Sequence, residues 1–192
     1  MQFGKYINTV VYIKPIQLFW RLKLPLNRMF LQLFPPGIKF SKFQIPDLSL
    51  INNKSESKHY QLFEEYIDLK KIDWHKNRNK LKKYHLHYFD FLENCNKESG
   101  QKIINKWIDE NPPSTKNDGW EPYPLSLRIV NWIFFLSRFG INPDRKTKNS
   151  LYLQGKWLYH QRELHLQANH FLKNIVALLF WGYCFSDKKM IA

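Results

Sequence analysis

The second half of the sequence consists of helix-length segments with apolar residues at helical spacing, separated by short turns that contain proline or glycine. The clearest segment is GWEPYPLSLRIVNWIFFLSRFG, residues 119–140, in which Pro124 suits a first helical turn and Gly140 suits a helix end. Its apolar stripe comprises Leu127, Val130, Ile133 and Phe134. Further helices are expected from about Ser99 to Pro112, over about 151–164 and over 169–185. No strand pattern competes there, so the sequence predicts an all-α succession of antiparallel helices joined by short loops.

The first 80 residues follow a different pattern. Five prolines, several lysines and isolated aromatic residues interrupt the first 58 residues, so an irregular basic and aromatic N-terminal region is expected over 1–80. Residues 59–74 fit a strand or a loop equally well. The helical domain is expected over 81–192, beginning with LKKYHLHYFDFL at residues 81–92, which places an aromatic face at helical spacing.

Charge and composition restrict the partners of this chain. It has 192 residues, 44% of them hydrophobic, which is enough for one domain with a buried core. Thirty Lys and Arg against 16 Asp and Glu give a net charge of +14, and 17% of the residues are aromatic. Such a chain is suited to polyanions, so acidic glycan, nucleic acid and anionic membrane are all open partners.

Several other classes of protein do not fit. Cys95 and Cys184 have no partner spacing, so neither a disulfide framework nor a zinc site is expected, and no metal or other cofactor is predicted. Lys14 and Pro15 interrupt the apolar N-terminus, and no cleavage site follows, so no secretory signal is expected. The apolar run 175–185 is about half the length of a membrane span, and we therefore expect a buried helix and no transmembrane segment.

Four polar or aromatic residues near the 119–140 helix are candidates for ligand binding. Arg128 and Asn131 are three residues apart, so they share one face of an otherwise apolar helix. A charge placed there needs a partner or a ligand; the alternative is a structural hydrogen bond within the core. Trp120 and Tyr123 precede the helix and could stack on a sugar ring, with core packing as the alternative.

The stretch ELHLQANHFLKN, residues 163–174, contains the candidates for chemistry. Asn169 and His170 stand where an apolar helix begins, and a helix start attracts anions through its free N–H groups and its dipole. A carboxamide and an imidazole at that point could together hold a carboxylate. The alternative is an Asn169 helix cap beside an incidental histidine.

Three stretches, LHYFDFL, GWEPYPLSLRIVNWI and ELHLQANHFLKNIVALLFWGYCF, occur in this order and resemble the heparinase II/III-like family of polysaccharide lyases. The resemblance covers about Trp74 to the C-terminus and implies the first part of an α/α toroid. It also implies β-elimination on uronic-acid glycans such as heparan sulfate or alginate. In that chemistry the match assigns Asn169 to neutralising the uronate carboxylate, and His170 to neutralisation or proton transfer. The predicted substrate-binding residues are Trp120, Tyr123, Arg128 and Asn131.

The sequence departs from this family after the Asn-His pair. Members supply a tyrosine acid from a later helix and a further residue from a β-sandwich domain, whereas here Ala192 follows His170 by only 22 residues. The expectation is therefore the front part of a lyase, from a truncated reading frame or a split enzyme that a separate chain completes, and inactive alone. Family members act in the periplasm or outside the cell, although this chain shows no signal peptide.

Two other functions compete with the lyase reading. A non-catalytic basic helical module could bind polyanions through its net charge, but nucleic acid is not expected, because the usual RNA-binding signatures are absent. A membrane-surface protein could use the basic, aromatic segment 5–43. This reading ranks last, because the prolines are expected to prevent one long amphipathic helix.

Overall fold

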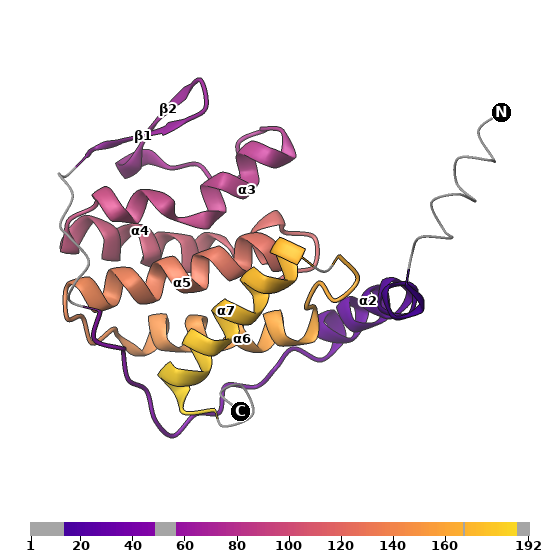
Figure 1. The fold of residues 1–192 in the computed structure, drawn as a ribbon. Coiled ribbons are helices and arrows are strands. Elements are labelled where there is room, and N and C mark those ends of the chain that lie inside the picture. The colour runs from indigo at the N-terminus through magenta and orange to yellow at the C-terminus, as the bar shows by residue number, and fades with distance from the viewer. Residues whose placement is uncertain (1–13, 49–56, 167, 188–192) are drawn as a thin grey trace.

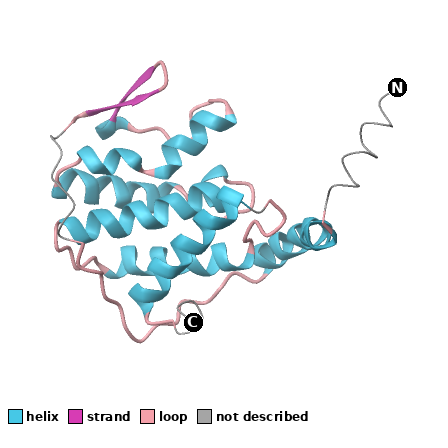
Figure 2. Ribbon diagram, viewed as in Figure 1, coloured by secondary structure: helices cyan, strands magenta, loops and turns pink. Residues whose placement is uncertain are grey.

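The computed structural model describes residues 14–48, 57–166 and 168–187, which form a mostly helical body with a small hairpin (Figures 1 and 2). The helices are α2 (Pro15–Leu33), α3 (Lys80–Tyr88), α4 (Lys97–Glu110), α5 (Pro122–Arg138), α6 (Arg145–His160) and α7 (Ala168–Phe185). The strands are β1 (His59–Leu62) and β2 (Glu65–Asp68). Short 3-10 turns cover Leu69–Lys71, Asp90–Asn94 and Asp118–Trp120. The predicted helical class is confirmed.

Side-chain caps explain where two helices begin earlier than the sequence patterns predict. Asn96 caps α4 by accepting a hydrogen bond from the Ser99 backbone N–H at 2.8 Å, so Ser99 lies inside the helix. Asp144 caps α6 through the Thr147 N–H at 2.8 Å, and the helix therefore starts at Arg145 and not near Leu151. Prediction placed these starts late because it followed the apolar residues, whereas the first turn of each helix is polar.

Helix α5 lies at the centre of the body and packs against α3, α6 and α7. Its buried apolar face comprises Leu125, Ile129, Trp132, Ile133, Phe135 and Leu136. This face is rotated from the predicted stripe, since Leu127, Val130 and Phe134 are only half-buried. Gly140 ends this part of the chain as predicted, with a positive φ of 56° that costs glycine little.

A group of tryptophans fills the core between these helices. Trp107, Trp132, Trp157 and Trp181 are each at most 1% exposed. Trp181 packs so closely on α6 that a Cβ added at Gly155 would lie 2.2 Å from its Nε1. The same ring donates a hydrogen bond to the Leu151 carbonyl at 3.0 Å. A glycine at 155 is therefore required for the contact between α6 and α7.

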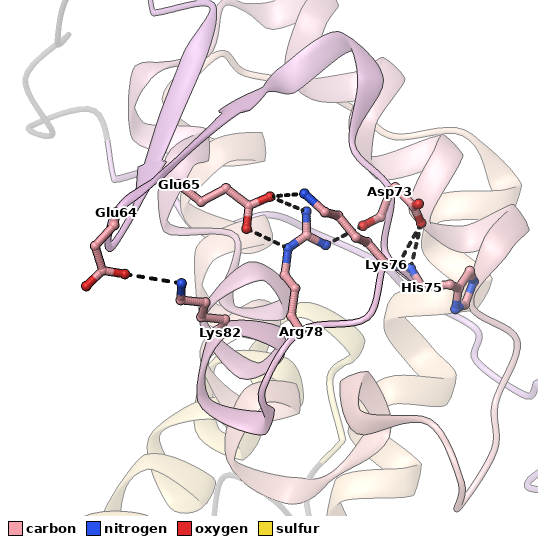
Figure 3. A network of polar contacts seen from close by, with 7 residues as sticks. All are labelled: Glu64, Glu65, Asp73, His75, Lys76, Arg78 and Lys82. Atoms are coloured by element: carbon pink, nitrogen blue, oxygen red, sulfur yellow. Dashed lines mark hydrogen bonds and ion pairs between the residues drawn. The ribbon is translucent and has the colours of Figure 1, made fainter.

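The hairpin is fastened to the rest of the body by a network of charges, drawn in Figure 3. Glu65 accepts hydrogen bonds from Arg78 Nε and Nη2 at 3.1 and 3.0 Å and from Lys76 Nζ at 2.7 Å. Arg78 also donates to the Asp73 carbonyl at 2.7 Å. These bonds lower the pKa of the Glu65 carboxyl to about 2, and the bonds from Arg78 have a larger effect than the bond from Lys76. The network therefore ties β2 to the loop that precedes α3.

The expectation of an irregular N-terminal region is wrong for residues 15–33, where α2 forms a 19-residue helix. Pro25 lies inside this helix, where it removes one N–H donor and its ring crowds the carbonyl four residues earlier, but its neighbours are mostly good helix formers such as Leu, Arg, Lys and Met. The residues between α2 and position 48 form no regular secondary structure and are hydrogen-bonded to the body: the Gln44 N–H donates to the Cys184 carbonyl at 2.8 Å. Residues 59–68, for which strand and loop were both open, form the hairpin.

Candidate functional site

The loop between α6 and α7 brings Glu163 against His170. Ala168, with a φ of 51°, turns the chain into α7, so Asn169 and His170 fall in the first helical turn. Both carboxylate oxygens of Glu163 lie 3.2 Å from His170 Nδ1. The Glu163 residue is 8% exposed, whereas 43% of the His170 side chain is accessible. A half-exposed imidazole is thus held by a buried carboxyl group.

Buried polar groups keep Glu163 in place. Its backbone N–H donates to Asn174 Oδ1 at 2.8 Å, and Asn174 Nδ2 lies 3.4 Å from Glu163 Oε2. The same amide nitrogen donates to Ser126 Oγ at 2.8 Å, and Ser126 donates to the Pro122 carbonyl at 2.7 Å. Asn174 and Ser126 are fully buried. This chain of hydrogen bonds fixes the loop against α5 and α7, so the orientation of His170 follows from the core.

The charge state of Glu163 depends on two opposing influences. Burial raises the pKa of its carboxyl group, and the nearby His170 acts in the opposite direction. The net pKa shift is upward. A carboxylate at Nδ1 favours the imidazole tautomer that carries its proton on Nδ1, which leaves the Nε2 lone pair to accept a proton or a hydrogen bond. In that tautomer the pair can act as a base with its orienting group.

Two tyrosines extend this site over α5 and α3. The Tyr123 and His170 rings lie 4.2 Å apart between centroids and are tilted by 33°. Tyr88 meets Tyr123 edge to face at 5.8 Å, and burial raises the pKa of the Tyr88 phenol. Asn131 Nδ2 donates to the Tyr88 carbonyl and to Asp90 Oδ1, each at 2.8 Å. Tyr123 and Asn131, both predicted from sequence, thus belong to the same run of contacts as His170.

Asn169 is exposed at the start of α7, next to His170 in the chain. It lies within the helix and not at the capping position, so the cap interpretation of Asn169 is wrong. Consecutive residues of an α-helix point about 100° apart, so Asn169 and His170 are neighbours in the chain without facing each other. We define the His170 site as Asn169, His170, Glu163, Tyr123 and Asn131.

Trp120 and Arg128 lie elsewhere, and the structure gives both a role in the core. Trp120 is 2% exposed and donates from Nε1 to the Asn111 carbonyl at 3.0 Å. Arg128 is fully buried, with its guanidinium 3.8 Å from the centre of the Trp107 ring. A ligand cannot contact either side chain in this structure, so the prediction that they bind substrate needs correction. The helix spacing that placed Arg128 on an apolar face indicated burial and not access.

Sequence reasoning missed Glu163, Asn174 and Ser126. Asn174 carries a recognisable signal, because it is a carboxamide within an apolar helix and lies one turn after His170. Glu163 carries none, since a carboxylate in a polar loop is ordinarily solvated. Its burial depends on how α6 and α7 meet, which is a property of the tertiary structure.

A second surface feature is a hollow of about 460 Å³ at the start of α4. Its basic residues are Lys58, Lys70, Lys102 and Lys106, and Glu98 also lines it. Lys106 is engaged, because its Nζ bonds the Ile72 carbonyl at 2.8 Å and Glu110 at 2.7 Å. Lys58, Lys70 and Lys102 are exposed, so this lysine-lined hollow attracts anions without an oriented recognition group.

The chain matches no family model, and searches of curated proteins and of solved structures return no match. Within residues 14–48, 57–166 and 168–187, no three His, Cys, Asp or Glu side chains gather as a metal site requires. In the same residues no helix is both long and apolar enough to cross a bilayer.

Proposed function

We propose that this chain binds uronic-acid-containing polysaccharide at the His170 site, and that Asn169 and His170 carry two roles of a β-elimination. The observation that carries the proposal is the contact of His170 Nδ1 with the buried Glu163, which orients the imidazole while its ring stays accessible. The resemblance to heparinase II/III-like lyases motivates the choice of substrate. As part of the same proposal, α3 to α7 correspond to the first helices of an α/α toroid.

The proposed chemistry assigns one task to each exposed group. The Asn169 amide hydrogen-bonds the uronate carboxylate, which lowers the cost of the negative charge that develops when the neighbouring C–H proton leaves. His170 Nε2 accepts that proton, and Glu163 stabilises the imidazolium that results. Tyr123 supports the imidazole ring and offers an aromatic face for a sugar. The reaction also needs an acid that protonates the leaving oxygen, and neither Asn169 nor His170 is assigned this third role.

We therefore expect binding of acidic polysaccharide by residues 1–192 without formation of unsaturated product. Asn169→Ala should weaken binding of a uronate oligosaccharide about tenfold or more, because a hydrogen bond to a charged group contributes about 1.5–3 kcal/mol. Calorimetric titration measures the affinity, and ultraviolet absorbance of the unsaturated product measures turnover. Added salt should weaken the binding in the wild type.

Lys102→Glu is the matched control, because Lys102 is exposed in the lysine-lined hollow. It removes one positive charge and adds a negative one far from the His170 site. The affinity for a short uronate oligosaccharide should therefore change by no more than about twofold. If Lys102→Glu abolishes binding while Asn169→Ala does not, the non-catalytic polyanion-binding module replaces the proposal. Product that disappears in Asn169→Ala would show that this chain supplies the missing acid as well.

A further inference from the structure

Helix α2 has one face turned to the body. Gln17 Nε2 donates to the His165 carbonyl at 3.1 Å, and Asn27 Nδ2 donates to the His160 carbonyl at 2.8 Å. Leu31 is buried at 1% exposure, and Trp20 and Leu24 line a small hollow against α6. These five residues recur at helical spacing, so a single stripe of α2 holds it to the body.

The opposite face of α2 is apolar and exposed to solvent. Its members, with their exposed fractions, are Leu18 (47%), Phe19 (53%), Leu22 (69%), Leu26 (61%), Met29 (58%), Phe30 (54%) and Leu33 (63%). At about 100° per residue they fall within an arc of about 120°, and its centre lies about 160° from Leu31. Large exposed apolar surfaces of this kind mark interaction sites. Figure 1 shows α2 projecting from one side of the helical body.

Basic residues border this apolar face on both sides. At about 100° per residue, Lys23 lies about 20° beyond one edge of the apolar face, and Arg21 and Arg28 lie about 60° and 80° beyond the other edge, toward the stripe that contacts the body. The basic residues of positions 1–46 are Lys5, Lys14, Arg21, Lys23, Arg28, Lys39 and Lys42, and this segment contains no Asp or Glu. Half of the net charge of +14 therefore comes from the first quarter of the chain.

We propose that α2 lies in the headgroup region of an anionic bilayer, with its apolar face toward the acyl chains. A wide apolar face with basic borders and aromatic residues is the arrangement of an interfacial helix, in which long basic side chains reach the lipid headgroups. A second copy of the chain fits this face less well, because symmetric pairing would bring the basic borders together. The body is attached on the face that points away from the bilayer. Pro25 does not stop the helix, so the sequence-based objection to a long amphipathic helix no longer holds.

The test is vesicle flotation of the full chain, with phosphatidylcholine alone and with phosphatidylcholine mixed with phosphatidylglycerol. We expect the protein to float with the anionic vesicles. The fraction that floats with neutral vesicles should be at least about tenfold lower. Leu22→Glu with Leu26→Glu should reduce flotation about tenfold or more, because it places two charges in the apolar face. The control pair is Tyr66→Glu with Leu81→Glu, which changes residues that are 71% and 56% exposed elsewhere on the body. Circular dichroism checks that each variant stays folded.

Three results would overturn the proposal. Anionic vesicles could fail to float the wild type. The Leu22→Glu, Leu26→Glu pair could float like the wild type while Lys58→Glu with Lys102→Glu abolishes flotation, which would mean adsorption through the lysine-lined hollow. Light scattering could show dimers that the Leu22→Glu, Leu26→Glu pair dissociates while no vesicle binding occurs, which would assign the apolar face to a second copy.

Discussion

Replacing Arg128 with alanine is expected to lower the free energy of unfolding by about 3–5 kcal/mol. The guanidinium donates to the Gly119 carbonyl at 2.6 Å and to Gln154 Oε1 at 3.0 Å, and it lies over the Trp107 ring. Alanine would leave a cavity among large aromatic rings and two buried acceptors without their donor. Urea unfolding followed by tryptophan fluorescence measures the loss.

Arg128→Met separates the two causes, because methionine fills most of the space and donates no hydrogen bond. We expect it to lie between alanine and the wild type, since the Gly119 carbonyl still loses its donor at a cost of about 1–3 kcal/mol. Folded Arg128→Met should bind the uronate oligosaccharide like the wild type. A loss below about 1 kcal/mol for Arg128→Ala, or lost binding in a folded Arg128→Met, would contradict a purely structural role.

Lowering the pH from 7 to 4 is expected to reduce the free energy of unfolding by about 3 kcal/mol through His87 alone. His87 is 2% exposed and accepts a hydrogen bond from Trp107 Nε1 at its Nδ1, 3.0 Å away. Burial, with a smaller effect of the Arg128 charge, lowers the pKa of this imidazole from 6.5 to about 3. Between pH 6.5 and about pH 3, the unfolded chain therefore carries a proton on His87 that the folded chain does not. Stability falls by about 1.4 kcal/mol per pH unit as the pH drops through this window.

His87→Gln isolates this contribution, because a glutamine oxygen can still accept the Trp107 bond and does not titrate. Chemical unfolding of both proteins at several values between pH 7 and pH 4 gives the two slopes. The wild type should lose about 3 kcal/mol more than the variant over this range. Other groups, such as the Glu65 carboxyl with its lowered pKa, titrate in both proteins and cancel. Equal slopes would show that His87 does not provide the acid sensitivity.

The sequence predicted the helical body well because that information is local. Apolar residues at helical spacing, Pro122 and Pro124 in the first turn of α5 and Gly140 after its end are each recognisable within one segment. The same local view failed for α2, where the prolines suggested an irregular chain. Pro15 stands in the first turn, where it is favourable, and the helix continues through Pro25 because good helix formers surround it.

The candidate site was predictable only where its residues belong to the same segment of the chain. Asn169 and His170 are adjacent, and Tyr123 and Asn131 share α5. Glu163 became part of the site because the α6–α7 loop turns it inward against Asn174, a contact that no local pattern encodes. Arg128 shows the opposite error, since a lone charge on an apolar face suggested a ligand when Gln154 and Gly119 in the core accept hydrogen bonds from two of its three nitrogens.

The measurement that tests the uronate-binding proposal most directly compares two oligosaccharides that differ only in the carboxyl group. One is a uronate oligosaccharide, and the other is the same molecule with its carboxyl groups reduced to alcohols. We expect the wild type to bind the uronate about tenfold or more tightly, because the Asn169 amide recognises the carboxylate, and Asn169→Ala to lose most of that preference. Equal affinity of the wild type for both oligosaccharides, or a preference unchanged in Asn169→Ala and lost in Lys102→Glu, would contradict the proposal.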